Sequence, residues 1–358
     1  MKSVVNKPMN MCARVLGLAL FATVVAAPAA QATPINIIPD AGLAANTAAL
    51  AAFNRAATTL GSRFSDPITV NINANLGSLG AGIIGSASST LLLGGYTTVR
   101  NLMVADAAGE ADDAIVAALP TAAQFSATMP TGFGLTGNVL LSSANAKALG
   151  VDVSSIIGLS PDGTITFSSD FAFDYDNSDG VSAGLIDFET VALHELVHAL
   201  GFISSVDQID QLVGSSPVVR IDFTTLDMFR FAANNAPTNA SEFTSKPRNF
   251  VPGAASGAVT SDVANAWAMS TGVTKGDGRQ ASHWKDDDIT GIHVGIMDPT
   301  LSFGLAFGLT DADIRALDLI GWDQVDAAAV PEPASILLLG SGLVAVIRNR
   351  KRRGQTIQ

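Results

Sequence analysis

Two of the chain's four histidines, His194 and His198, stand four residues apart, and Glu195 directly follows the first. On an α-helix, residues i and i+4 project from the same face, so both imidazoles can bind one metal ion. This is the H-E-x-x-H pattern of zinc hydrolases, in which the glutamate is the general base. A short pattern can arise by chance, but the scarcity of histidine in this chain favours the metal site.

The motif supplies two ligands, whereas a catalytic zinc ion is held by three protein ligands and a water molecule. Ser204 stands where the extended pattern H-E-x-x-H-x-x-G-x-x-H would place a third histidine, and serine is a poor ligand. The candidates are His283, in A-S-H-W-K-D-D-D, and His293, in G-I-H-V-G-I-M-D-P. We favour His283 and keep His293 as the alternative.

The motif has to lie on a helix, and its surroundings predict one from about 187 to 201. Leu193, Leu196 and Leu200 supply an apolar surface, and Gly201 follows where the helix would stop. The other predicted elements are a helix at 46–63, strands at 68–73, 138–141 and 164–168, a Gly- and Ser-rich loop at 75–95, and helical segments at 97–106, 111–118 and 143–149.

The second half of the chain is less periodic. Residues 225–231 fit either a strand or a helix, and 233–262 are loop-like. Thr310 and the acidic residues after it predict a capped helix that runs to Ile320. Strands, then the motif helix, then an irregular half predict an α+β fold. We expect an N-terminal subdomain of about 33–202, which carries a mixed sheet, and a C-terminal subdomain of about 203–329.

A run of acidic residues before the motif helix suggests a second metal. Asp174, Asp176 and Asp179, in F-D-Y-D-N-S-D-G, begin like a calcium-binding loop but lack the glycine and the final glutamate that such a loop requires. Two interpretations of this stretch therefore remain, a loop that binds Ca²⁺ and an ordinary acidic turn before a helix. The run Asp286-Asp287-Asp288 is expected to be solvated.

Both ends of the chain have the composition of processing signals. Residues 1–32 combine three basic residues, an apolar run and a final Ala-Gln-Ala, which predicts a secretory signal peptide. The single cysteine, Cys12, lies within it, so the mature domain at 33–329 has no disulfide. Residues 330–353 combine Pro-Glu-Pro, a short apolar segment and a basic tail.

The charge of the central part is strongly negative. Of 20 basic and 32 acidic residues, three basic ones lie in 1–32, and five basic ones with Glu332 lie after residue 330. Residues 33–330 therefore carry 12 basic and 31 acidic residues, a net charge of −19. Such a surface argues against binding to nucleic acid or to anionic membranes.

The second half resembles the leishmanolysin-type metzincins. H-E-L-V-H-A-L-G-F is followed far downstream by S-H-W-K and then by G-I-M-D-P. The resemblance implies a zincin-like fold in which His194, His198 and His283 bind zinc, with Glu195 as catalytic base. It further implies that Met297 underlies the site and that Gly201 ends the helix. The substrate would be a protein or peptide extended along a sheet edge.

The tail resembles a PEP-CTERM sorting signal. In that group of bacterial surface proteins, an exosortase-type membrane peptidase recognises and removes the tail. The resemblance implies Sec-type export, transient membrane contact through the C-terminal signal, and a location in the periplasm, on the outer surface or in the matrix of a Gram-negative bacterium.

Together these features predict a secreted or surface-sorted zinc-dependent endopeptidase. One alternative is a non-catalytic envelope or matrix protein that retains a degenerate protease domain. Another is a zinc hydrolase that acts on non-peptide substrates. Replacement of Glu195 separates these functions, because only an enzyme loses turnover while it retains zinc.

Overall fold

The computed structural model describes residues 31–110, 112–158, 161–214 and 219–325. The predicted PEP-CTERM tail and all but two residues of the predicted signal peptide lie outside the described residues. Within the described part, no helix is both long and apolar enough to cross a membrane.

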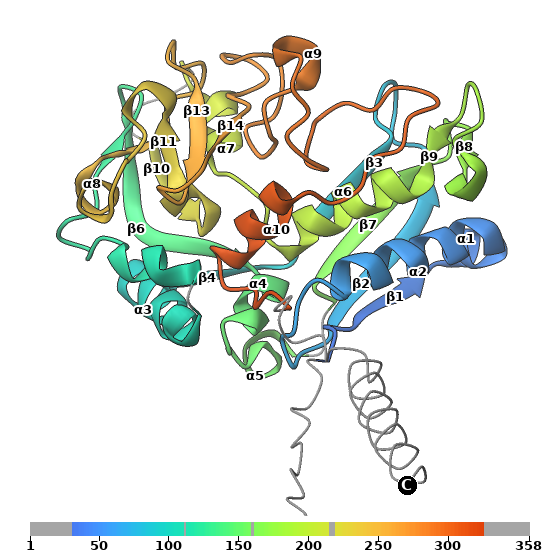
Figure 1. Cartoon of the computed structure of the whole chain (residues 1–358), viewed down its shortest axis with the longest axis horizontal. Coiled ribbons are helices and arrows are strands. Elements are labelled where there is room, and N and C mark those ends of the chain that lie inside the picture. The colour runs from blue at the N-terminus through green and yellow to red at the C-terminus, as the bar shows by residue number, and fades with distance from the viewer. Residues whose placement is uncertain (1–30, 111, 159–160, 215–218, 326–358) are drawn as a thin grey trace, which may run out of the picture. The chain divides into compact units, whose positions relative to one another are not determined.

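A four-stranded mixed sheet forms the first layer of the fold (Figure 1). Three strands run parallel to one another, and the last strand runs antiparallel to its neighbour. In spatial order they are β1 (Ile35–Pro39), β2 (Val70–Gly77), β7 (Gly163–Ser168) and β3 (Gly85–Ser89). The structure is therefore α+β, as the sequence predicts.

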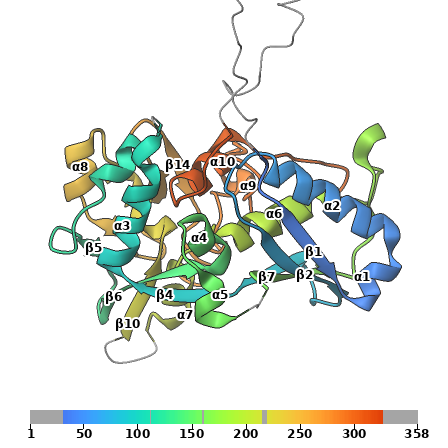
Figure 2. The same cartoon turned by 90° about the horizontal axis from the view of Figure 1, so that it is seen from below.

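Two helices, α2 (Thr47–Gly61) and α6 (Phe188–Leu200), pack together over one face of this sheet (Figure 2). Strand β2 explains why: Val70, Ile72 and Ala74 are buried beneath the helices, whereas Asn71 and Asn73 on the opposite face are only partly buried. Side chains alternate between the two faces of a strand, so this two-residue period gives one apolar face and one polar face.

A second sheet combines segments from both halves of the chain. Strand β6 (Phe133–Ser142) lies between β4 (Leu91–Gly95), which is antiparallel to it, and β10 (Val219–Thr224), which is parallel to it. The boundary expected near residue 202 is thus bridged by strand pairing. The remaining sheets are antiparallel β11 (Arg230–Ala232), β13 (Ala258–Ser261) and β14 (Ala266–Met269), and the short pairs β5 (Ala127–Thr128) with β12 (Arg248–Asn249) and β8 (Phe173–Asp174) with β9 (Ile186–Asp187).

The other helices are short. The α-helices are α1 (Ala41–Ala45), α3 (Tyr96–Asp106), α4 (Ser143–Ala148), α5 (Val153–Ile157), α7 (Val206–Leu212), α8 (Ala240–Ser245), α9 (Asp287–Thr290) and α10 (Asp311–Asp318). The 3-10 helices are η1 (Ala107–Gly109), η2 (Asp112–Ala118), η3 (Asn177–Asp179), η4 (Leu226–Phe229) and η5 (Ala233–Asn235).

Most predicted elements are present, but two predicted loops are wrong. Residues 75–95 include strands β3 and β4, and 233–262 include α8, β12 and β13. Small residues give a strand little local signal, and pairing with neighbouring strands decides its conformation. The undecided stretch 225–231 contains both candidates, because η4 leads directly into β11.

Candidate metal centre

Helix α6 begins at a side-chain cap and ends at a glycine. At its start, the Asp187 side chain accepts a hydrogen bond from the Thr190 amide at 2.9 Å, which caps the helix. At its end, Gly201 adopts a φ of 123°. A Cβ there would lie 3.0 Å from Ile320 Cδ1 and 3.2 Å from the Asn145 Cβ, so glycine is required by both conformation and space.

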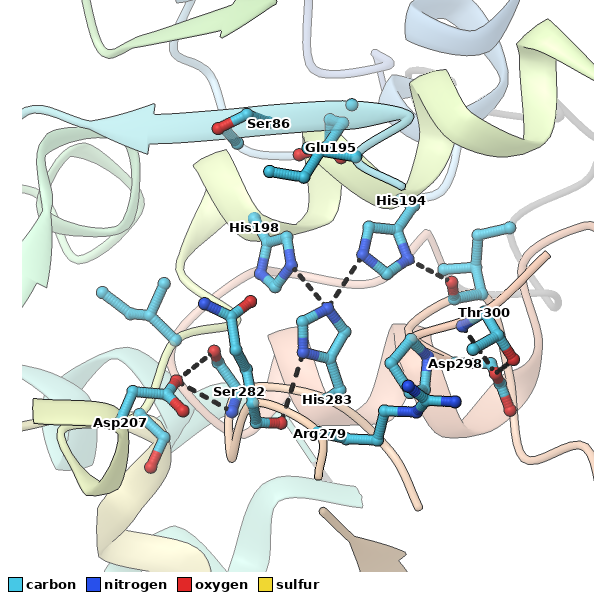
Figure 3. Close-up of a pocket in the computed structure, with 18 of the residues that line it drawn as sticks. Ser86, His194, Glu195, His198, Asp207, Arg279, Ser282, His283, Asp298 and Thr300 are labelled. Atoms are coloured by element: carbon cyan, nitrogen blue, oxygen red, sulfur yellow. Dashed lines mark hydrogen bonds between the residues drawn. The ribbon is translucent and has the colours of Figure 1, made fainter. Parts of the chain in front are cut away.

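Three imidazoles converge beside this helix (Figure 3). The Nε2 atom of His283 lies 3.1 Å from Nε2 of His194 and 3.3 Å from Nε2 of His198. His194 and His198 come from adjacent turns of α6, and His283 comes from a loop 85 residues further along the chain from His198. The structure thus brings together the two motif histidines and the favoured third candidate.

The opposite ring nitrogen of each histidine contacts a backbone carbonyl. His194 Nδ1 lies 2.8 Å from the Ile296 oxygen, His198 Nδ1 lies 2.8 Å from the Phe202 oxygen, and His283 Nδ1 lies 3.3 Å from the Gln280 oxygen. A carbonyl oxygen only accepts, so each Nδ1 carries the hydrogen. Each Nε2 is left with a lone pair directed at the other two.

This donor set fits a metal ion. Three lone pairs that converge without a hydrogen between them repel one another, and a cation at their meeting point removes that repulsion. Burial lowers the pKa of His198 to about 3 and lowers the pKa of His194 and His283 as well, so the metal-free imidazoles are neutral at pH 7. Neutral imidazole is the form that binds zinc.

Glu195 lies beside the imidazoles under strand β3. Its side chain lines the same cleft as the three histidines, and burial raises its pKa to about 8. Gly85 of β3 makes room for it, because a Cβ at position 85 would lie 2.6 Å from Glu195 Oε1. Gly85 is a residue that sequence reasoning missed, since it fell within a predicted loop.

The cleft above the centre has a volume of about 870 Å³. Strand β3 forms one wall, with Gly85, Ser86, Ala87 and Ser89 among the lining residues. β3 is also the last strand of its sheet and pairs on its sheet side with β7. Its other edge therefore borders the cleft beside Glu195.

Two charged residues, the half-buried Asp207 and the buried Arg230, hold the loop that carries His283. Asp207 of α7 accepts hydrogen bonds from the backbone amide and the hydroxyl of Ser282 (Figure 3), and it also accepts one from the Ala281 amide. Arg230 of β11, which is 2% exposed, donates to the Ala281 oxygen at 3.1 Å. The sequence offered no signal for either role, because neither residue lies near a histidine along the chain.

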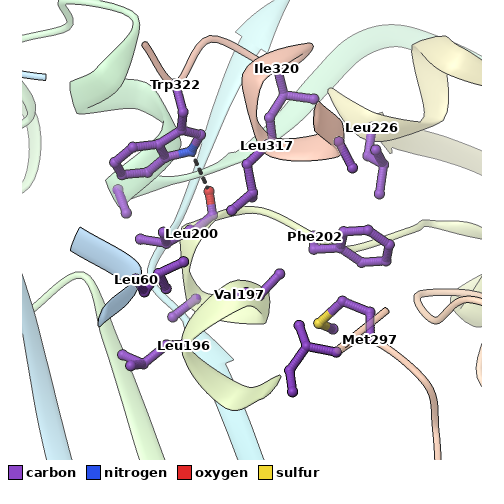
Figure 4. Close-up of a cluster of buried hydrophobic side chains, with 14 of the residues drawn as sticks. Leu60, Leu196, Val197, Leu200, Phe202, Leu226, Met297, Leu317, Ile320 and Trp322 are labelled. Carbon is purple, nitrogen blue, oxygen red and sulfur yellow. Dashed lines mark hydrogen bonds between the residues drawn. The ribbon is translucent and has the colours of Figure 1, made fainter. Parts of the chain in front are cut away.

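Met297 lies in the apolar cluster next to α6, with Val197 and Phe202 (Figure 4). It is fully buried, and its backbone oxygen accepts a hydrogen bond from the Trp284 amide at 2.9 Å. The preceding residue, Ile296, supplies the carbonyl that His194 contacts. The turn that contains Met297 therefore orients one histidine directly and the His283 loop through its backbone.

Asp313 of α10 fixes that turn in place. Its two carboxylate oxygens accept from the Trp284 indole at 2.7 Å and from the Ile296 amide at 2.8 Å. The same carboxylate completes a capping box with Thr310, as the acidic first turn had indicated in part. The sequence predicts the cap, but it gives no sign that Asp313 also holds the metal centre.

His293 lies apart from the three converging imidazoles. Its ring stacks on Phe307 at 4.1 Å between centroids, and its Nδ1 lies 3.5 Å from Asp287 Oδ2. With Asp287 and Asp298 it forms a separate His-carboxylate group on the same cleft. Ser204 stands where the extended motif would place a third histidine, and it donates its hydroxyl hydrogen to Asp227.

The three residues of the predicted calcium loop do not converge. In the described part of the chain, the groups of histidines and carboxylates with ligand atoms within 4.8 Å of one another do not include Asp174, Asp176 and Asp179. Asp174 instead accepts from the amides of Asp176 and Ser182, which lowers its pKa. This stretch forms a hydrogen-bonded acidic turn.

The prediction of a solvated run at 286–288 is wrong for Asp286. This residue is fully buried, pairs with Arg279 and accepts from the Asp288 amide at 2.8 Å as the cap of α9. Burial of a carboxylate costs free energy unless hydrogen bonds and a counter-charge offset it, and here both are present.

Residues 329–353 match the family described as the PEP-CTERM protein-sorting motif. This match indicates an exported, surface-sorted bacterial protein and implies processing by exosortase-type machinery. Comparison with curated proteins and with solved structures found no match.

Proposed function

We propose that this exported protein is a zinc-dependent endopeptidase. The observation that carries the proposal is the convergence of three neutral imidazoles, with Nε2 separations of 3.1 and 3.3 Å, beside a buried glutamate in an open cleft. A structural zinc site closes all four positions with protein ligands, whereas a catalytic site keeps one open. Three histidines facing a cleft correspond to the second kind.

His194, His198 and His283 would hold the ion in this function. Bound zinc would polarise a substrate carbonyl and lower the pKa of a water molecule. With the ion bound, Glu195 would accept a proton from the attacking water and pass it to the nitrogen of the leaving amine. The close approach of Gly85 to its carboxylate confines the Glu195 side chain between β3 and the helix. The Asp313 carboxylate and the Asp207 carboxylate act as positioning groups, because they orient the segments that carry the ligands.

The edge of β3 supports a peptide substrate. An extended chain can add to an exposed sheet edge through backbone hydrogen bonds, and β3 presents such an edge along the cleft. Its small side chains, Ser86 and Ala87, leave the strand accessible. The antiparallel edge strand, the H-E-x-x-H helix and the buried Met297 support, as part of the same proposal, the resemblance to leishmanolysin-type metzincins.

The test is hydrolysis of casein by the purified full-length chain, with zinc content measured on the same samples. We expect about one zinc per chain. Glu195→Gln should keep the zinc and lose about 10²- to 10⁴-fold in rate. Glu189→Gln is the matched control, because Glu189 lies in the first turn of the same helix and pairs with Arg55 away from the centre.

The alternatives predict other outcomes. Folded protein without zinc would contradict the metal centre itself. Bound zinc without turnover of any peptide would favour a non-catalytic envelope protein, and turnover of esters but not of peptides would favour a different zinc hydrolase.

A further inference from the structure

A second group of metal-ligating side chains lies at the opposite end of α10 from Asp313. Glu110, which follows η1, Asp113 of η2 and Asp318, the last residue of α10, each place one carboxylate oxygen within 4.8 Å of the others. Asp113 is 2% exposed and Asp318 is 1% exposed. The group is separate from the histidine centre, and nothing in the proposed reaction uses it.

We call Glu110, Asp113 and Asp318 the acidic cluster, and further carboxylates surround it. Burial, and then repulsion from Asp323, raises the pKa of Glu110 and also of two neighbouring carboxyls, the buried Asp66 and the half-buried Asp106. Arg315 supplies positive charge through ion pairs with Asp113, Asp318 and Asp262. One guanidinium carries one positive charge, so full ionisation of Glu110, Asp113 and Asp318 away from bulk water is costly without a further cation.

Asp318 shows where a ligand is needed. One of its carboxylate oxygens meets Arg315, while the other, Oδ1, is buried and has no hydrogen-bond partner. The residue also ends a helix, where the unpaired carbonyls make the potential negative and disfavour a carboxylate. A buried, unpaired carboxylate oxygen in such a position requires either a proton or a cation.

We propose that the acidic cluster is a calcium site, with Glu110, Asp113 and Asp318 as its carboxylate ligands. All three are oxygen donors, the set that hard divalent cations prefer. Calcium accepts irregular arrangements of six to eight oxygens, whereas magnesium demands near-ideal octahedral geometry. The chain is exported, and calcium sites of extracellular proteins have Kd values of about 10⁻⁴ to 10⁻³ M.

Calcium would link Glu110 and Asp113 to helix α10. The first turn of that helix carries Asp313, which holds Trp284 and Ile296 at the metal centre. Calcium would therefore stabilise the element that positions the histidine centre, although it would bind at the other end of that element. This role does not depend on the proposed hydrolytic activity.

The experiment is a thermal-unfolding titration of the full-length chain. The protein is stripped with EDTA, dialysed, supplied with one equivalent of zinc, and then titrated with CaCl₂ or with MgCl₂. We expect the Tm to rise by about 5 °C at a calcium concentration about a hundredfold above Kd, and by much less with magnesium. Isothermal titration calorimetry should give one calcium per chain, with release of protons.

Three variants make the titration specific. Asp318→Asn and Glu110→Gln should each lose the calcium-dependent rise. Asp311→Asn should keep it, because Asp311 is an exposed residue in the first turn of the same helix. If Asp318→Asn does not fold, the partly exposed Glu110→Gln decides the question. Folded wild-type protein without a calcium-dependent shift, or an undiminished shift in Glu110→Gln, would overturn the proposal.

Discussion

The histidine centre and the acidic cluster both gather metal-ligating side chains in sheltered positions, but they differ in charge. The three imidazoles are neutral, and each is oriented by a backbone carbonyl. The acidic cluster consists of carboxylates that repel one another around Arg315. Neutral ligands can therefore be oriented before a metal arrives, whereas buried carboxylates are costly until a proton or a cation joins them.

The two ends of α10 show the same contrast within one helix. Asp313 in its first turn accepts hydrogen bonds from Trp284, Ile296 and Thr310 and is favoured by the helix dipole. Asp318 in its last turn keeps one oxygen unpartnered. An aspartate is thus a stabilising cap at the first turn of α10 and a candidate metal ligand at the last turn.

The largest expected effect is the separate restoration of hydrolysis and of thermal stability after EDTA treatment, which distinguishes the histidine centre from the acidic cluster. EDTA should abolish casein hydrolysis and lower the Tm. Zinc alone should restore hydrolysis, because Glu195 needs the ion beside it, and calcium alone should restore the calcium-dependent part of the Tm without hydrolysis. Both quantities are measured on the same preparation. Restoration of both by either ion alone would break the distinction between the clusters.

The next effect concerns Gly85 above the histidine centre. Gly85→Ala places a Cβ 2.6 Å from Glu195 Oε1 and 2.9 Å from Val191 Cγ1, so the glutamate must shift. A shift of about 1 Å in a catalytic group costs about 10- to 100-fold in kcat/KM. Zinc content should stay unchanged.

The matched control for Gly85 is Gly77→Ala at the end of β2, where an added Cβ meets nothing within 4 Å. Equal kcat/KM values for the two alanine variants would contradict the role assigned to Gly85.

Asp313 sharpens the comparison between the two ends of α10. Asp313→Ala removes the capping box and leaves buried donors of Trp284 and Ile296 without an acceptor. We expect a loss of about 2–4 kcal/mol in the free energy of unfolding, measured by urea denaturation. Zinc affinity should fall about 10- to 100-fold, because the turn that orients His194 is released. Asp311→Ala, in the same turn but exposed, should stay within about 0.5 kcal/mol of wild type.

The smallest effect is the pH dependence of stability in calcium-free protein. Burial and neighbouring carboxylates raise the pKa of Asp66 and Asp318 from 3.8 to about 8. A carboxyl with a higher pKa in the folded state binds more protons when folded, so its contribution to stability is complete below pH 3.8 and is lost as the pH rises toward 8.

The difference in urea midpoint between calcium-loaded and calcium-free protein should therefore grow between about pH 5 and pH 8. The Asp318→Asn variant should show a smaller growth. A difference that is constant over this range would show that the cluster does not titrate with folding.

Sequence reasoning reached the parts of the site that depend on local spacing. The four-residue step from His194 to His198 predicts one helix face, and α6 supplies it. Thr310 and the acidic residues after it predict the start of α10, and a capping box is present. Both inferences work because helical contacts lie within four residues, so the relevant partners are neighbours in the sequence.

Other parts of the structure could not be read from local pattern. Strand β3 lies in a stretch of small residues, and its pairing with β7 joins segments that are far apart in the chain. Asp207 and Arg230 hold the His283 loop across separations of 74 and 51 residues. No local preference encodes such contacts.

The sequence by itself determined the motif helix, its capping and the identity of the possible ligands, because these follow from residue type and short spacing. Only the tertiary structure decided that His283 joins His194 and His198 while His293 lies elsewhere, and that Glu110, Asp113 and Asp318 meet. These contacts depend on which distant segments the buried core brings together. The free energy of burial follows the total apolar surface removed from water and not the spacing of any few residues.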